Sequence, residues 1–149
     1  MRIDPIPTIP PFDPALSPAL ALRHAMSLRL STDPPLLALL GGPQIHDVPP
    51  PGAAFPFVTL GEAVVADWST ATEGGSELSL TLHVWSRAGG RAEAFALTAA
   101  VQQALHDAPL ALAGHRLANL RATTAEVRRE ADGRTFHGLV RLRAVTEPA

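Results

Sequence analysis

Histidines are the residues of this 149-residue chain best suited to acid–base or metal chemistry, and there are six of them. They are His24, His46, His83, His106, His115 and His137. No two have the four-residue spacing that places two imidazoles on one helix face, and the sequence H-E-x-x-H is absent. His46-Asp47 and His106-Asp107 are dipeptides of the kind seen in metal phosphohydrolases, but further His and Asp ligands at matching positions are missing. We therefore predict no metal site and no cofactor.

His83 and His137 lie in segments of alternating polarity, which predicts strands with both imidazoles on the polar side of a sheet. They could be neighbours there, and we interpret them as hydrogen-bonded surface histidines rather than catalytic bases. His106 stands at the end of a predicted helix, where the helix dipole favours a cation. No G-x-S-x-G sequence is present to supply a nucleophilic serine. A small hydrolase or ligand-binding domain that uses the histidines is kept as an alternative.

The composition excludes several classes of chemistry. The chain has no cysteine and no lysine, so all 12 of its cationic side chains are arginine. Disulfides, thiol nucleophiles, Walker A lysines and Schiff bases are therefore excluded. The formal net charge of −2 gives no general attraction to nucleic acid, and the apolar runs are far shorter than the ~20 residues that span a bilayer. We predict a protein that is not an enzyme and has no membrane partner.

The arginines crowd the last third of the chain and alternate with glutamates. They are Arg121, Arg128, Arg129, Arg134, Arg141 and Arg143. Mixed signs predict ion pairs, within or between subunits, rather than a uniform track for phosphates. We take Arg121, Arg128, Arg141 and Arg143 as candidate contacts to another subunit, with a solvated sheet face as the alternative.

Residues 1–17 form a proline-rich segment that predicts an extended arm of polyproline type. Its large apolar side chains, Ile3, Ile6, Ile9 and Phe12, recur every three residues. Because a polyproline II helix has about three residues per turn, these four side chains would share one edge. The spacing favours an arm that contacts a neighbouring subunit over a frayed terminus.

Residues 18–149 read as one domain of alternating helices and strands. Helices are predicted at 18–30, 35–40 and 91–106, and strands at 44–48, 55–68, 77–85, 116–130 and 135–145. Ser17 would cap the first helix, Gly61 would mark a bulge, and Asp132-Gly133 predicts a hairpin turn. This order predicts an α+β fold with a mostly antiparallel sheet and helices packed on one of its faces. Phe95 falls on the outer face of the third helix and is a further candidate contact.

Four segments together resemble a known family: 55–62 (FPFVTLGE), 80–87 (LTLHVWSR), 104–110 (ALHDAPL) and 132–138 (DGRTFHG). In this order and with similar gaps, they are similar to the DUF3168 family of tail-completion or tail-terminator proteins. Its members occur in long-tailed phages and in the gene transfer agents of alphaproteobacteria. The resemblance covers residues 18–148, and none of its motifs is catalytic.

The resemblance implies a structural protein that forms a hexameric ring on the head-proximal end of the tail tube. The implied partners are other copies of the chain, the major tail-tube protein and the neck (stopper) protein, and DNA passes through the lumen without sequence-specific binding. The implied location is the neck region of a virion or virus-like tail, after assembly in the bacterial cytoplasm. A stopper on the head side of the neck is the alternative. The proline-rich start departs from the family pattern.

Overall fold

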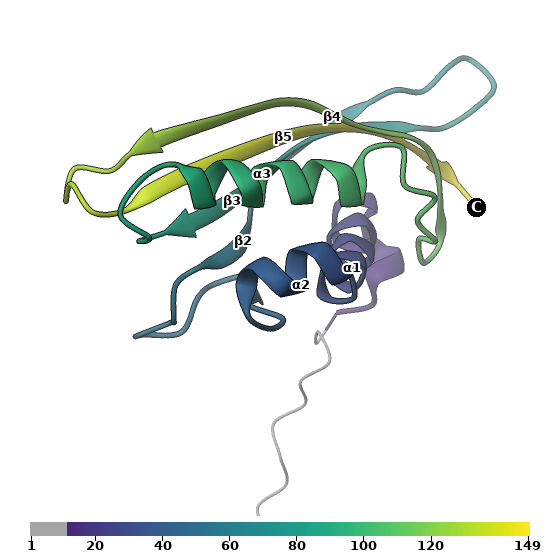
Figure 1. Cartoon of the computed structure of the whole chain (residues 1–149). Coiled ribbons are helices and arrows are strands. Elements are labelled where there is room, and N and C mark those ends of the chain that lie inside the picture. The colour runs from purple at the N-terminus through teal and green to yellow at the C-terminus, as the bar shows by residue number, and fades with distance from the viewer. Residues whose placement is uncertain (1–11) are drawn as a thin grey trace, which may run out of the picture.

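The computed structural model of the chain describes residues 12–149 (Figure 1). Of the predicted arm, Ile3, Ile6 and Ile9 lie outside the described residues, and Phe12 is 63% exposed. The described chain starts beside the helices, on the side of the molecule away from the sheet (Figure 1).

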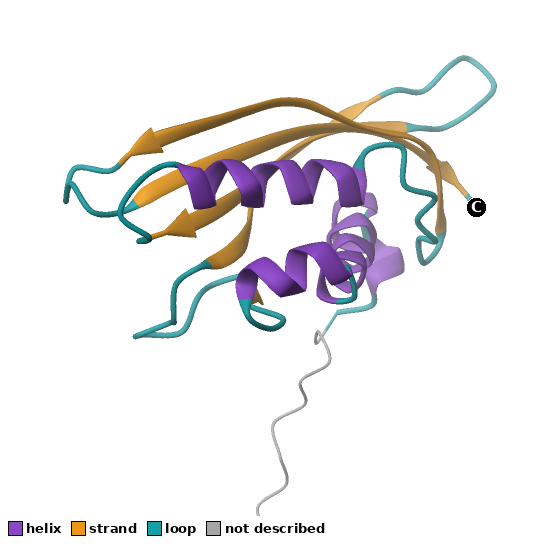
Figure 2. Ribbon diagram, viewed as in Figure 1, coloured by secondary structure: helices purple, strands orange, loops and turns teal. Residues whose placement is uncertain are grey.

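Five strands form one sheet in the order β1-β2-β3-β5-β4. The strands are β1 (Ile45–His46), β2 (Phe57–Asp67), β3 (Ser76–Ser86), β4 (His115–Arg129) and β5 (Phe136–Pro148). β1 runs parallel to β2, and all the other neighbours are antiparallel. The three helices α1 (Pro18–Ser31), α2 (Pro34–Leu40) and α3 (Ala92–Leu105) lie on one side of the sheet (Figure 2). The predicted α+β fold is confirmed.

The segment before α1 corrects one prediction. Residues Pro14–Leu16 form a 3-10 helix, which begins where the Asp13 carboxylate accepts the N–H of Ala15 at 3.0 Å. The Ala15 carbonyl also lies 3.1 Å from Nε2 of His115 at the start of β4. The expectation of an extended arm through residue 17 is therefore wrong over these residues, because a capped turn docks them on the domain.

Side-chain caps set the starts of α1 and α2, and the cap predicted at Ser17 is confirmed. The Ser17 hydroxyl accepts the N–H of Leu20 at 3.3 Å, and the Asp33 carboxylate accepts the N–H of Leu36 at 3.1 Å. Each cap is followed by proline at the first helical position, where a missing N–H costs nothing. Gly41, with φ +73°, ends α2 in the left-handed conformation that glycine adopts without strain.

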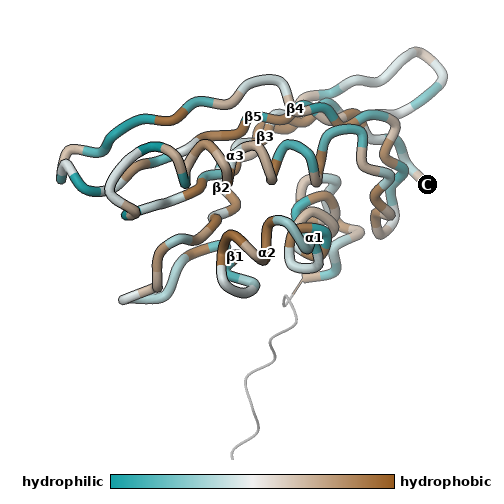
Figure 3. Tube along the Cα trace, in the orientation of Figure 1, coloured by the Kyte–Doolittle hydropathy of each residue, from teal (hydrophilic) through white to brown (hydrophobic). Residues whose placement is uncertain are grey.

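The core lies between the helices and one face of the sheet. The alternate residues of β3, Leu78, Leu80, Leu82 and Val84, are all at most 3% exposed and pack toward the helices. The matching alternation of hydrophobic and hydrophilic residues can be followed along the strands in Figure 3. The bulge predicted at Gly61 is present at Leu60/Ala63, and a second irregularity lies at Ala122/Thr124. A third, at Leu117/Asn119, was not predicted.

Candidate functional site

The sheet face turned away from the helices, called the open face below, carries polar and aromatic side chains at alternate positions of its strands. β3, β5 and β4 contribute alternate residues to it: Ser79, Thr81, His83 and Trp85; His137, Leu139, Arg141 and Arg143; Arg121, Thr124, Glu126 and Arg128. Histidines and aromatic rings occupy one end of this face, and arginine–glutamate pairs occupy the other. The two halves have different chemistry.

His83 and His137 contact each other directly on the open face. Nδ1 of His83 lies 2.6 Å from Nε2 of His137, which confirms that the two residues are neighbours. The other ring nitrogens face carboxylates. Nε2 of His83 is 2.7 Å from Oε1 of Glu62, and Nδ1 of His137 is 2.8 Å from Oε1 of Glu130. The four side chains form one chain that joins β2, β3 and β5 to the residue that follows β4.

The environment of His137 sets the direction of the hydrogen bond between the two rings. Burial lowers the pKa of His137, although the hydrogen bond to Glu130 acts in the opposite direction. A neutral His137 donates Nδ1–H to Glu130, so its Nε2 can only accept. In the contact between the two rings, Nδ1–H of His83 then donates to Nε2 of His137. The pKa of Glu62 is lowered first by a hydrogen bond from its own backbone and then by the His83 side chain.

The ring of Trp85 continues this arrangement toward β2. It stacks on His137 with ring centroids 3.9 Å apart and planes inclined by 9°, and its Nε1–H donates to Oγ1 of Thr59 at 3.1 Å. Phe57 follows, with its centroid 6.4 Å from that of Trp85. All four ring nitrogens of His83 and His137 have partners, so the pair is built to hold strands together rather than to move a proton onto a substrate.

A groove of about 430 Å³ opens beside Trp85 at the β1–β2 edge of the sheet, and the sequence reasoning missed it. Its lining residues are Asp47, Val48, Pro49, Phe57, Thr59, Leu60, Gly61 and Trp85. Most of this lining is apolar, and Val48 is 81% exposed. The groove arises because the loop after β1 returns along β2, a pairing that no local sequence pattern specifies.

The arginines form ion pairs within the chain, as one of the two predicted arrangements requires. Arg143 binds Glu77 through two hydrogen bonds of 3.1 and 3.2 Å, and its guanidinium lies 5.2 Å from the ring of Trp68. Arg141 and Arg128 both reach Glu126, at 3.0 and 3.2 Å. These three candidate contact residues therefore have partners already. Arg121 has no ion-pair partner among residues 12–149.

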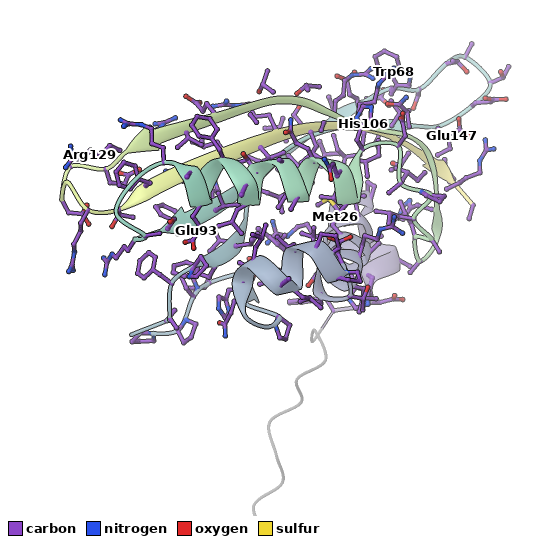
Figure 4. All side chains as sticks on the ribbon, viewed as in Figure 1. Met26, Trp68, Glu93, His106, Arg129 and Glu147 are labelled. Atoms are coloured by element: carbon purple, nitrogen blue, oxygen red, sulfur yellow. The ribbon has the colours of Figure 1, made fainter. Side chains whose placement is uncertain are left out.

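Other exposed apolar side chains lie away from the histidines. Phe95, on the outer face of α3, is 56% exposed, as predicted. Val64 and Trp68 are 64% and 52% exposed in the β2–β3 hairpin, which extends past the rest of the sheet (Figure 1). Figure 4 shows Trp68 at this hairpin, far from Met26 in the core. Neither Val64 nor Trp68 is among the contact residues predicted from the sequence.

His106 stands at the end of α3, as predicted, and also contacts β4. It caps the C-terminal end of α3, and its Nδ1 accepts the backbone N–H of Ala122 at 3.1 Å (Figure 4). A nitrogen that accepts this hydrogen bond carries no proton, and Nε2 of the same ring lies 3.3 Å from the Asp107 carboxylate. The ring joins the end of α3 to β4.

Across residues 12–149, no cluster of three or more histidine, aspartate or glutamate side chains is arranged to hold a metal ion. Within the same range, no helix is long and apolar enough to cross a membrane.

The sequence profile of one family, described as tail completion protein gp17, matches residues 24–147. The chain belongs to the tail completion protein gp17 family. This confirms the tail-completion part of the resemblance seen in the sequence, and the narrower DUF3168 assignment stays a prediction. Because the family consists of structural tail proteins, the prediction that the chain is not an enzyme is also confirmed, and the alternative of a small hydrolase is wrong.

Two known proteins are similar to this chain over most of its length. The tail completion protein gp17 of Bacillus phage SPP1 is 29% identical over 125 residues, which is 83% of this chain and 90% of that protein. A chain in the virion of the native gene transfer agent particle is 35% identical, with a TM-score of 0.81, over 87% of this chain and 96% of that one. The solved structure of SPP1 gp17 is 26% identical, with a TM-score of 0.56, over 83% of this chain and 87% of that one.

Proposed function

We propose that this protein ends the tail of a phage or gene transfer agent particle as a closed, hexameric ring at the head-proximal end of the tail tube. The ring stops tube polymerisation and provides the surface on which the neck (stopper) protein docks, and DNA leaves the head through its lumen. In this proposal the chain is made in the bacterial cytoplasm and remains in the neck region of the finished particle.

The observation that carries the proposal is the similarity to a chain of the gene transfer agent virion, with a TM-score of 0.81 at 35% identity. That similarity covers almost all of both chains, so it concerns the whole domain and not one motif. The family match over residues 24–147 gives the same tail-completion role from sequence alone.

The surface of the described domain suits a ring. A closed ring needs two different patches that meet head to tail. Phe95 on the helical side and Arg121 on the open face are exposed on opposite layers. The net charge of −2 and the ion-paired arginines suit a lumen through which DNA slides without being held.

Deletion of the gene in the producing strain tests the proposal. We expect tails of uncontrolled length that fail to join filled heads, and recovery of normal particles when the wild-type chain is supplied in trans. Tails of normal length joined to heads would contradict the proposal. Tails of normal length that only fail to join would favour the stopper alternative.

A further inference from the structure

The groove beside Trp85 is an apolar hollow at the edge of the open face, and neither the histidine chain nor the arginine–glutamate pairs fill it. Phe57 and Trp85 form an aromatic wall, with their rings inclined by 28°, and Val48 and Pro49 form the opposite rim. Such a wall is the usual binding surface for proline-rich segments, whose rings and side chains lie flat on aromatic rings.

The polar groups around the groove are already engaged. The Thr59 hydroxyl accepts Nε1–H of Trp85 at 3.1 Å. Asp47, at the rim, is bound by Arg23 at 2.5 Å. A proline-rich segment has fewer backbone N–H groups, so it leaves fewer hydrogen-bond donors without a partner when it enters the groove.

The chain itself carries a segment of this chemistry. Residues 1–11 include Pro5, Pro7, Pro10 and Pro11, and Ile3, Ile6 and Ile9 recur every three residues. In a polyproline II conformation, eleven residues span about 34 Å at about 3.1 Å per residue. That length is enough to reach a neighbouring molecule.

The position of the groove favours another copy of the chain over the same copy. The described chain begins at the helical side of the molecule (Figure 1), whereas Phe57, Thr59 and Trp85 belong to the open face. An arm that fills its own groove must cross the sheet edge, but an arm on an adjacent copy need not. We propose that residues 1–11 of one copy bind the Val48–Trp85 groove of the next copy. The assignment of the occupant to a neighbouring copy rests on the proposed ring. The chemistry of the groove does not depend on the ring.

Cysteine cross-linking tests the proposal directly, because the natural chain has no cysteine. In the full-length chain, Ile6→Cys is combined with Val48→Cys and oxidised at high protein concentration. We expect disulfide-linked oligomers on a non-reducing gel. Ile6→Cys with Val64→Cys is the matched control. Val64, on β2, is exposed as Val48 is, but it does not line this groove. This control pair should give at least tenfold less product.

Equal cross-linking of the two pairs, or disulfides that form only within single chains, would overturn the proposal.

A second measurement does not depend on the formation of a ring. The receptor is the full-length chain carrying Trp68→Phe, in which Ile3, Ile6 and Ile9 are also changed to serine. This leaves Trp85 as the only tryptophan. A synthetic peptide of residues 1–12 with the unchanged sequence is added to this receptor. The peptide should change the fluorescence of Trp85, and Val48→Asp should weaken binding at least tenfold. An unchanged signal, or binding indifferent to Val48→Asp, would overturn the inference while leaving the proposed tail function intact.

Discussion

Nδ1 of His83 and Nε2 of His137 lie 2.6 Å apart, and each imidazole hydrogen-bonds a carboxylate on its other side. The contact joins the two central strands, β3 and β5, which are distant in sequence. Because Nε2 of His137 can accept this hydrogen bond only while it is unprotonated, the contact depends on pH.

Acidification is expected to destabilise the fold through His137. Burial lowers its pKa below the ordinary value of 6.5, so the unfolded state binds a proton at a higher pH than the folded state does. Stability should therefore rise with pH between the lowered pKa and about 6.5, and fall as pH drops through that window. Chemical denaturation between pH 5 and 8 measures the slope.

His137→Gln should flatten that slope, and His24→Gln, at an exposed helical site, should leave it unchanged. An identical pH slope in the wild type and His137→Gln would show that another group is responsible. Glu62, whose pKa is also lowered, should add a further loss of stability only below about pH 4.5.

Gly61 allows the histidine chain to form. A Cβ at this position would lie 2.5 Å from Nε2 of His83 and 2.6 Å from the Thr81 carbonyl. The carbonyl belongs to the backbone and cannot swing away, so Gly61→Ala should cost about 1–3 kcal/mol of unfolding free energy. Gly90→Ala is the control, because a Cβ there meets nothing within 4 Å and the change should be near neutral. Equal stabilities would contradict this account.

Gly138 sets the distance between α3 and the sheet. A Cβ here would lie 2.4 Å from Cγ2 of Val84 and 2.5 Å from Cγ2 of Thr98. Both neighbours are β-branched and buried, so they have few alternative rotamers. We expect Gly138→Ala to lower the thermal midpoint by several degrees, equivalent to about 1–3 kcal/mol. A midpoint within one degree of wild type would show that α3 and the sheet can accommodate the added Cβ.

Phe95 should matter to assembly and not to folding. Its side chain is 56% exposed on α3, so Phe95→Ser should change the free energy of unfolding by no more than ~0.5 kcal/mol. If the helix face contacts another subunit, the variant should give at least tenfold fewer finished particles in a complementation assay. Gln103→Ser, on the exposed side of the same helix, is the control. Normal particle yields from Phe95→Ser would remove this face from the contact.

The sequence predicts local structure well where the pattern is strong. The caps at Ser17 and Asp33, the buried face of β3, the bulge at Gly61 and the turn at Asp132-Gly133 all follow from local rules. The order of the strands does not, because the pairing of β3 with β5 joins residues far apart in the chain. The same holds for the groove and for the hydrogen bond of His106 to β4, which depend on how distant segments meet.

A reconstruction of the neck in purified particles tests the central claim most directly. We expect six copies of this chain in a closed ring around a central channel, between the tail tube and the head-side neck protein. Density for the chain on the head side of the neck, or its absence from the end of the tail, would contradict the proposed function.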